Sequence, residues 1–446
     1  MGSYFGTDGI RGRAGEGKLA PAALEAMAQA FGAHFGEGAT AVIGMDTRES
    51  GPGIREALTR GLVRQGVDVL HLGILPTPAT AFATHKLGGD FGLMVTASHN
   101  PWQDNGVKLF GPDGRKISDD AQSAIEARIE TAISGDIADA ETEGEARDVS
   151  NMQDAYVESL HDAFRSTGQS GLDGLSLVID CANGAAFETL PAVLRGLGAD
   201  IHVIGAEPDG RNVNDACGST HPEALSEAVL SQGADIGIAM DGDADRLILA
   251  DDTGRVVDGD QIIARLATDW DQQGRLYGRR VVSTVMSNLG LERYLEDRGI
   301  KLHRAAVGDR YVSAMMAETG ANLGGEPSGH LLMTDYGPTG DGSLAALMVL
   351  ASLKDAGVAA SEHLALFEPF PQLLVNVRYD GPSPLADPDV LSAVTRVDER
   401  LGNTGRVLVR ASGTEPLIRI MAEGNDAELV SQAAEELRLV IESRAA

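Results

Sequence analysis

Three aspartates alternate with small residues in the segment 240–246, which reads Met-Asp-Gly-Asp-Ala-Asp-Arg. Alternate residues of an extended loop point the same way, so Asp241, Asp243 and Asp245 can converge on one hard divalent cation. An EF-hand is excluded, because its loop needs Gly at the sixth position and Glu at the twelfth. Magnesium fits better, since it commonly uses a few carboxylates together with phosphate oxygens. The alternative is a solvated acidic turn. Arg246, beside the three carboxylates, could be their internal counter-charge or a phosphate ligand.

A hydroxyl group follows a predicted strand at Ser98, in the segment Thr-Ala-Ser-His-Asn-Pro of residues 96–101. The pair Asn100-Pro101 favours an extended or turn conformation that ends the strand. Open α/β sheets bind ligands outside the carboxyl ends of their strands, so Ser98 stands where a ligand would bind. The alternative is that Ser98 only caps the turn.

A basic loop lies between two predicted strands near the C-terminus. It offers the guanidinium groups of Arg410 and Arg419, the hydroxyls of Ser412 and Thr414, and the unhindered backbone N–H of Gly413. These are the donors that hold a phosphate dianion. The alternative is a hairpin loop whose arginines pair with surface acids.

A glycine-rich loop offers a carboxylate, a hydroxyl and an imidazole at Glu326, Ser328 and His330. Such groups are suited to hydrogen bonding with sugar hydroxyls, although glycine-rich turns with a serine are common. Arg11 and Lys108 are two further cations in glycine-containing segments. Taken alone, either could be an ordinary surface charge.

Hydrophobic periodicity predicts the elements that position these residues. The predicted strands are 41–45, 67–72, 91–97, 175–180, 200–204, 235–240, 247–250, 281–286 and 302–307. Helical spacing covers 23–34, 54–62, 187–197, 291–295 and 344–353, and the acidic stretch 138–148 predicts a linker or an exposed edge. After Phe370 the order changes to strands 373–378, 407–409 and 417–421 and an amphipathic helix, 427–442. The predicted domains are three α/β units, 1–150, 151–252 and 253–366, and an α+β unit, 367–446.

The composition excludes several classes of protein. With 36 Lys+Arg against 66 Asp+Glu, the formal net charge is −30, so most of the surface would repel nucleic acid and anionic membranes. The two cysteines, Cys181 and Cys217, form no CxxC or His/Cys cluster, which argues against a disulfide scaffold or structural zinc and for a cytoplasmic location. The longest apolar run, 344–353, is too short to cross a bilayer. No Walker loop, GxGxxG, GxSxG or HExxH occurs.

Four segments in this order, spread over the whole chain, resemble the α-D-phosphohexomutase superfamily. They are 96–101, 241–246, 325–330 and 410–419. The closer resemblance is to the bacterial phosphoglucosamine mutases, through the opening segment 4–12, the run 307–312 and the segment 412–416. One departure is Pro327, where most such enzymes have Gln. Because Glu326, Ser328 and His330 still match, this departure concerns the rigidity of the loop more than its function.

The resemblance implies a fold of three similar mixed-sheet α/β domains and a C-terminal TATA-binding-protein-like α+β domain around a central cleft. It implies interconversion of glucosamine 6-phosphate and glucosamine 1-phosphate, a step toward UDP-N-acetylglucosamine and peptidoglycan precursors. Ser98 would be the phosphorylated residue, and one magnesium ion would be held by its phosphate with Asp241, Asp243 and Asp245. A hexose or hexosamine 1,6-bisphosphate would be the activator. The expected partner is a small sugar phosphate, and a homodimer is left open.

The resemblance also implies roles for individual residues. The residues expected to bind the substrate are Arg246, Glu326, Ser328, Arg410, Ser412, Gly413, Thr414 and Arg419. Magnesium, Arg246 and Lys108 would neutralise the charge that develops during phosphoryl transfer. Lys108 and His330, with Arg11 in support, are the candidates for general acid and base, and the spacing does not choose between them.

Three alternatives to this function stay open. A phosphomannomutase or phosphoglucomutase would use the same mechanism on another sugar. A phosphoserine phosphohydrolase would release phosphate to water and would not need the distal basic loop. A non-catalytic sensor of sugar phosphates would bind without turnover.

Overall fold

The computed structural model describes residues 4–6, 8–412 and 416–445. The chain forms two compact units, one of Met1–Met286 with Leu302–Ala365, the other of Ser287–Lys301 with Leu366–Ala446. Four sheets follow one another along the sequence, which confirms the predicted architecture of three mixed α/β sheets and a small C-terminal sheet. No helix in the described part of the chain is long and apolar enough to span a membrane.

The first sheet has six strands in the order β1-β5-β4-β2-β3-β6. Its strands are β1 (Ile10–Arg13), β2 (Thr40–Met45), β3 (Asp68–Ile74), β4 (Phe91–Val95), β5 (Asp104–Phe110) and β6 (Ala146–Asp148), and its helices are α1 (Pro21–Phe35), α2 (Gly51–Arg64), α3 (Thr77–Lys86) and α4 (Asp119–Ile133). The central strands β2 and β4 pair in parallel and are buried along almost their whole length, which explains their continuous apolar sequence. Strand β5 runs antiparallel to β4. The acidic stretch ends in β6, whose residues are all exposed, so the predicted exposed edge is confirmed.

The second sheet has five strands in the order β11-β10-β9-β7-β8. Its strands are β7 (Ser176–Asp180), β8 (Asp200–Ile204), β9 (Ile236–Met240), β10 (Leu247–Asp251) and β11 (Val256–Val257), and its helices are α5 (Met152–Arg165), α6 (Thr189–Gly196) and α7 (Glu223–Gln232). Strands β7, β8 and β9 are parallel, and β10 returns antiparallel to β9. Because β11 pairs with β10, this sheet continues past the predicted boundary at residue 252.

The third sheet has four strands in the order β13-β12-β14-β15. Its strands are β12 (Arg280–Thr284), β13 (Lys301–Ala305), β14 (Leu323–Gly325) and β15 (Leu331–Met333), and the helices of this stretch are α8 (Gly259–Gln272), α9 (Leu289–Glu296), α10 (Asp309–Thr319), α11 (Gly342–Ala356) and α12 (Ala360–His363). The apolar run 344–353 lies within α11 and is buried except at Ser352. This run therefore forms a core helix.

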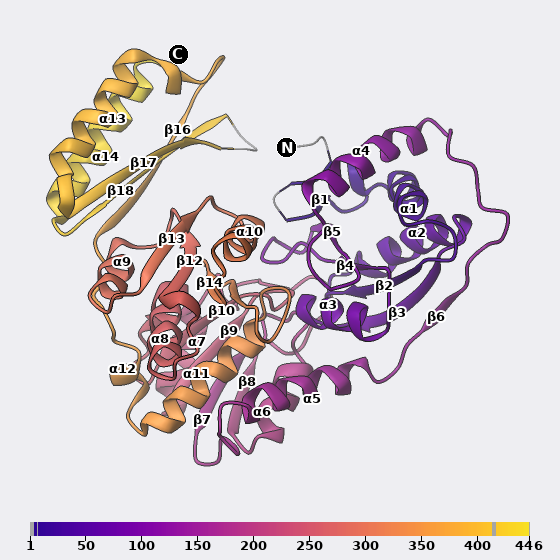
Figure 1. The fold of residues 1–446 in the computed structure, drawn as a ribbon, viewed down its shortest axis with the longest axis horizontal. Coiled ribbons are helices and arrows are strands. Elements are labelled where there is room, and N and C mark those ends of the chain that lie inside the picture. Colours follow the sequence, from indigo (N-terminus) through magenta and orange to yellow (C-terminus); the bar gives the residue numbers. More distant parts are fainter. Residues whose placement is uncertain (1–3, 7, 413–415, 446) are drawn as a thin grey trace. The chain divides into compact units, whose positions relative to one another are not determined.

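The fourth sheet has the antiparallel order β16-β18-β17. Its strands are β16 (Gln372–Arg378), β17 (Gly405–Ala411) and β18 (Leu417–Gly424), and its helices are α13 (Pro388–Leu401) and α14 (Ala427–Glu442). Figure 1 shows both helices on one face of this sheet. Val397 of α13, Leu437 of α14 and Ile420 of β18 share one fully buried cluster, so the predicted α+β organisation of this unit is confirmed.

Candidate active site

Ser98 lies just beyond β4, at the carboxyl end of a central strand. Its side chain is buried, and its backbone has φ +53°, in the left-handed region. A non-glycine residue in that region costs on the order of 1 kcal/mol or more, so the surroundings must hold it there. The Ser98 hydroxyl donates to Asp241 Oδ2 over 2.6 Å. The serine loop and the aspartate loop, 143 residues apart in sequence, therefore meet at this hydroxyl.

The three aspartates lie between β9 and β10, and all are buried. One oxygen from each carboxylate can be chosen so that all three lie within 4.8 Å of one another. Gly242 lets the two loops approach, because a Cβ at that position would lie 2.6 Å from the Ser98 carbonyl oxygen. Cβ atoms do not come that close to backbone oxygens, so this place in the loop requires glycine.

The aspartate cluster has the properties of a divalent cation site. The Oδ1 atom of Asp243 is buried and has no hydrogen-bond partner. Burial, followed by the negative charges of Asp243 and Asp245, raises the pKa of Asp241 to about 8. A cation bound among these carboxylates would relieve both the unpaired oxygen and the repulsion. Three converging carboxylate oxygens are the donors that magnesium takes, alongside water and phosphate oxygens, so the residues fit this metal.

Lys108 supplies one positive charge to the cluster from β5. Its Nζ lies 2.6 Å from Asp245 Oδ2, 2.7 Å from Asp243 Oδ2 and 3.2 Å from Asp8 Oδ2. Burial of Lys108 opposes the charged form, but these carboxylates outweigh it and raise the pKa well above its usual value. Lys108 is therefore a buried ammonium group in the site and not a surface charge.

Lys108 belongs to a closed ring of alternating charges, which we call the charge ring. Its six members, in order, are Lys108, Asp245, His330, Asp309, Lys116 and Asp8. His330 Nδ1 lies 3.4 Å from Asp245 Oδ1, and its Nε2 lies 3.5 Å from Asp309 Oδ2. Lys116 pairs with both Asp309 and Asp8, and Asp8 closes the ring on Lys108.

The charge ring keeps His330 protonated. Burial alone would lower the pKa of this imidazole, but Asp245 and Asp309 raise it to about 9. His99, the residue after Ser98, behaves in the opposite way, because burial and the cations Arg246 and Arg11 lower its pKa to about 4. At neutral pH the site thus holds a charged imidazole at His330 and a neutral one at His99.

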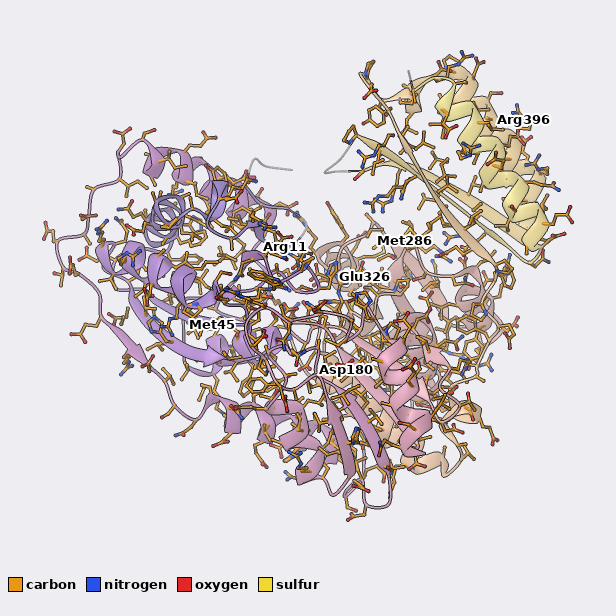
Figure 2. All side chains as sticks on the ribbon, turned by 180° about the vertical axis from the view of Figure 1, so that it is seen from behind. Arg11, Met45, Asp180, Met286, Glu326 and Arg396 are labelled. Atoms are coloured by element: carbon orange, nitrogen blue, oxygen red, sulfur yellow. The ribbon has the colours of Figure 1, made fainter. Side chains whose placement is uncertain are left out.

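Two arginines border the aspartates. Arg246 Nε lies 4.0 Å from both Asp241 Oδ2 and Asp245 Oδ1, and Arg11 pairs with Asp8. In each guanidinium the Nε atom is buried without a hydrogen-bond partner. These buried donors are available to an anionic ligand. Arg11 is labelled in Figure 2.

The predicted sugar-binding loop connects β14 to β15 and lies directly on the aspartate loop. Leu247 N–H donates to the Gly329 carbonyl over 3.0 Å. Glu326, labelled in Figure 2, is buried and accepts from Gly308 N–H over 3.0 Å, whereas Ser328 is exposed. The carbonyl of Pro327 accepts from Gly259 N–H over 3.1 Å, so residue 327 contributes an acceptor, which proline retains.

The predicted phosphate-binding loop belongs to the second unit. Arg410 of β17 and Arg419 of β18 are direct cross-strand partners. Burial, followed by the charge of Arg419, lowers the pKa of Arg410. Among the residues that the structure describes, no carboxylate forms an ion pair with either guanidinium. Ser412 N–H donates to the Leu417 carbonyl over 2.7 Å, and Gly413 and Thr414 lie outside the described residues.

Sequence reasoning missed several residues of the site. Asp8 and Asp309 stand in segments that carry the family resemblance, but no chemistry was assigned to them. Lys116 gave no signal, because its partner Asp309 is 193 residues away. Thr77 donates to Asp243 Oδ2 over 2.5 Å, and a single threonine at the start of a helix has no pattern that would reveal this contact.

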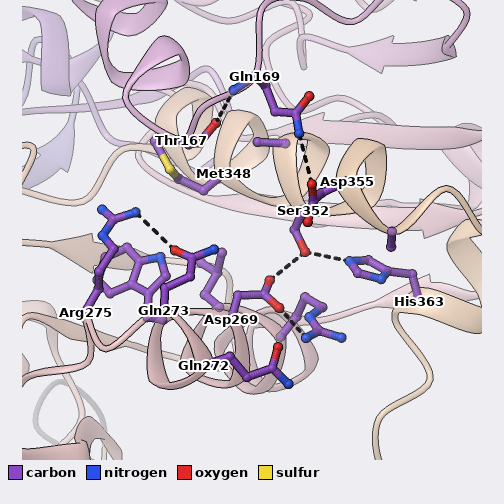
Figure 3. Close-up of a pocket in the computed structure, with 15 residues that line it drawn as sticks. Thr167, Gln169, Asp269, Gln272, Gln273, Arg275, Met348, Ser352, Asp355 and His363 are labelled. Carbon is purple, nitrogen blue, oxygen red and sulfur yellow. Dashed lines mark hydrogen bonds and ion pairs between the residues drawn. The ribbon is translucent and has the colours of Figure 1, made fainter.

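A separate cavity of about 300 Å³ lies among residues of α8, α11 and α12 (Figure 3). The Ser352 hydroxyl lies 2.5 Å from Asp269 Oδ2 and 2.7 Å from His363 Nε2. In a nucleophilic triad the imidazole lies between serine and carboxylate, whereas here the serine lies between the other two. These three polar groups satisfy one another, and none of the predicted site residues lines this cavity.

Comparison with known proteins gives matches along the whole chain. Family models of phosphoglucomutase/phosphomannomutase match in order: alpha/beta/alpha domains I, II and III at residues 2–135, 154–254 and 258–370, and the C-terminal domain at 374–440. The phosphoglucosamine mutase of Paracoccus denitrificans (strain Pd 1222) is 50% identical over 448 residues, covering 99% of each chain. That of Parvibaculum lavamentivorans (strain DS-1) is 49% identical over 446 residues, again covering 99% of each. A solved phosphoglucomutase/phosphomannomutase family protein from Burkholderia thailandensis has a TM-score of 0.81 and 25% identity, covering 98% of this chain and 97% of that one.

Proposed function

Because the chain belongs to the bacterial phosphoglucosamine mutases of the phosphohexomutase superfamily, we propose that it interconverts glucosamine 6-phosphate and glucosamine 1-phosphate through a phosphorylated Ser98. The observation that carries this proposal is the hydrogen bond of 2.6 Å from the Ser98 hydroxyl to Asp241. It puts a buried hydroxyl of the loop against a cluster of three carboxylates. Such a cluster repels a phosphoryl group unless a cation is bound, and a metal-assisted phosphoryl transfer meets that condition.

Magnesium is the proposed metal, held by Asp241, Asp243, Asp245 and the phosphate on Ser98. When bound, it would neutralise negative charge on the phosphoryl oxygens. The chain itself adds the cations Lys108 and Arg246 beside the same carboxylates. Their fixed positions would stabilise the transferring group without reorganisation at the moment of reaction.

The transfer exchanges one phosphate ester for another. In the direction of sugar phosphorylation, the bond between phosphorus and Ser98 Oγ breaks and a bond from the sugar hydroxyl to phosphorus forms. The hydroxyl loses one proton and Ser98 Oγ gains one, so the step is balanced. Lys108 and His330 both carry a proton at neutral pH, so we propose that they donate to a leaving oxygen and recover a proton from the attacking hydroxyl. Arg11 would hold a phosphoryl oxygen.

A mutase also needs a grip on the phosphate that is not transferred. We propose that Arg410 and Arg419, with Ser412, Gly413 and Thr414, provide it. Two guanidinium groups at directly paired positions repel each other, and a dianion between them removes that cost. The 1,6-bisphosphate intermediate would then reorient, and a hexose or hexosamine 1,6-bisphosphate would restore the phosphoserine. Glu326 and Ser328 would bind sugar hydroxyls in both orientations.

The test is the mass and the activity of purified protein. After incubation with glucose 1,6-bisphosphate, the intact mass is expected to rise by about 80 Da, with the increment on Ser98. Ser98→Ala should show neither the increment nor turnover, and Ser231→Ala, at an exposed position of α7, is the control for loss of a hydroxyl. Absence of the increment in an active wild-type enzyme would contradict the phosphoserine mechanism.

A phosphomannomutase or phosphoglucomutase with the same mechanism is the alternative. Turnover of glucosamine, glucose and mannose 6-phosphates should be measured side by side. We expect the highest kcat/KM for glucosamine 6-phosphate, and a strong preference for mannose 6-phosphate would overturn the assignment. The cytoplasmic location and the four domain ranges stay predictions, and a homodimer stays open.

A further inference from the structure

The carbonyl groups of the serine loop converge on one buried arginine. Arg48, beyond the end of β2, is fully buried. Its Nη1 donates to the carbonyls of Pro101 and Asp104 over 2.6 and 3.0 Å. Its Nη2 donates to the carbonyls of Ser98 and Asn100, both over 2.8 Å. A single guanidinium thus binds four carbonyl oxygens of the loop that carries the proposed phosphoserine.

The carboxylate of Asp46 fixes the Arg48 guanidinium itself. Arg48 Nε donates to Asp46 Oδ2 over 2.8 Å, and neither side chain is exposed. The same oxygen of Asp46 accepts from the Thr96 hydroxyl over 2.7 Å, and the Thr96 oxygen accepts from Ser98 N–H over 2.9 Å. Ser98 is therefore held through its N–H as well as its carbonyl by one network that starts at Arg48.

Asn214 reaches the same loop from the second sheet region. Its Nδ2 donates to the Ser98 carbonyl over 2.9 Å and to the Asn100 carbonyl over 3.3 Å. The Ser98 carbonyl thus accepts from both Arg48 and Asn214, which uses its two lone pairs. Rotation of Ser98 out of its left-handed conformation would turn this carbonyl away and break both bonds.

We propose that Arg48 is a positioning residue for phosphoryl transfer, which holds the backbone of Ser98 in the conformation that points its hydroxyl toward the aspartate cluster. This inference rests on the proposed function. Arg48 has no role in binding the sugar phosphate, since its donors are all used on the protein. Lysine cannot replace it, because an ammonium group is a point charge that cannot span four separate carbonyls.

The experiment compares Arg48→Lys with wild type in two assays. Steady-state kinetics with glucosamine 6-phosphate should show kcat lowered on the order of 100-fold, the loss typical of a misplacement near 1 Å, with KM within about twofold. Single-turnover phosphorylation by glucose 1,6-bisphosphate, followed by intact mass, should slow by a similar factor. Arg60→Lys is the control, because Arg60 is a half-exposed arginine of α2 that pairs with Glu25; it should leave both measurements unchanged.

Circular dichroism must show that Arg48→Lys is folded at the assay temperature. If it is not, Asn214→Gly decides, because it withdraws the second donor to the same carbonyls while glycine accepts the left-handed backbone of residue 214 (φ +57°). The inference is supported when the folded variant loses kcat with KM unchanged. It is overturned when kcat stays within threefold of wild type, or when the loss equals the unfolded fraction. Absence of turnover in wild type would instead refute the proposed function.

Discussion

Asp341→Asn is expected to stabilise the first unit at neutral pH and to leave its stability nearly unchanged near pH 4. Asp341 is the N-cap of α11, where Oδ1 accepts from Leu344 N–H over 2.9 Å and Oδ2 accepts from the Tyr156 hydroxyl over 2.8 Å. Burial raises the pKa of this carboxyl from 3.8 to about 6. Asparagine keeps an N-cap acceptor at a helix start and carries no charge at any pH.

The size and sign of the effect follow from proton linkage. Because the folded pKa lies above the unfolded value, the folded state holds an extra proton between about pH 4 and pH 6. The free energy of unfolding of wild type therefore falls as the pH rises through that window. A difference of about two pKa units corresponds to about 3 kcal/mol. The variant lacks this loss. The difference in free energy of unfolding between Asp341→Asn and wild type should therefore grow from near zero at about pH 4 to as much as about 3 kcal/mol above pH 6.

The assay is urea unfolding followed by tryptophan fluorescence at several pH values. Both tryptophans, Trp102 and Trp270, belong to the first unit, so the signal reports the part that contains Asp341. Asp90→Asn is the matched control, because exposed Asp90 also accepts a backbone N–H, from Thr40 over 2.8 Å. A difference between Asp341→Asn and wild type that stays constant from about pH 4.5 to 7.5 would refute the linkage argument.

Three further outcomes are expected. Asp243→Asn should weaken magnesium binding at least tenfold by titration calorimetry, since it removes a buried carboxylate charge from the cluster; unchanged affinity would place the metal elsewhere. Arg419→Ala should lower the kcat/KM of a mutase by a factor that corresponds to a loss of about 2 kcal/mol or more in transition-state stabilisation, the cost of losing a charge-assisted bond. A phosphohydrolase should keep most of its activity. Leu437→Ala should destabilise the second unit by about 3 kcal/mol, because a fully buried leucine leaves a cavity; in urea unfolding followed by far-UV circular dichroism, a change under about 1 kcal/mol would contradict this packing.

Local patterns predicted the elements whose structure depends on local sequence. The strand 200–204 and the helix 427–442 were predicted with the observed bounds, since their apolar residues recur at the period of one element. Helix α13 was missed, although Asp387 followed by Pro388 is a start signal and Val390 and Val397 share one face.

The candidate site could be predicted only in part. Ser98 and the aspartates were found because strand ends and alternate spacing are visible in the sequence. Lys108 was ambiguous, since nothing in β5 shows that Asp243, Asp245 and Asp8 surround it. Buried charges depend on partners that the fold brings together from distant segments, and one sequence does not contain that information.

The charge ring limits how this enzyme can change over generations. Its three cations and three carboxylates neutralise one another inside a molecule whose formal charge is −30. Replacing one member with a neutral residue therefore leaves a neighbouring buried charge unpaired. Divergent descendants should therefore lose members as adjacent pairs of opposite sign, such as Lys116 together with Asp309, because the remaining charges then still balance. An intermediate that has lost only one of the two would survive only while a substrate or ion supplied the missing sign.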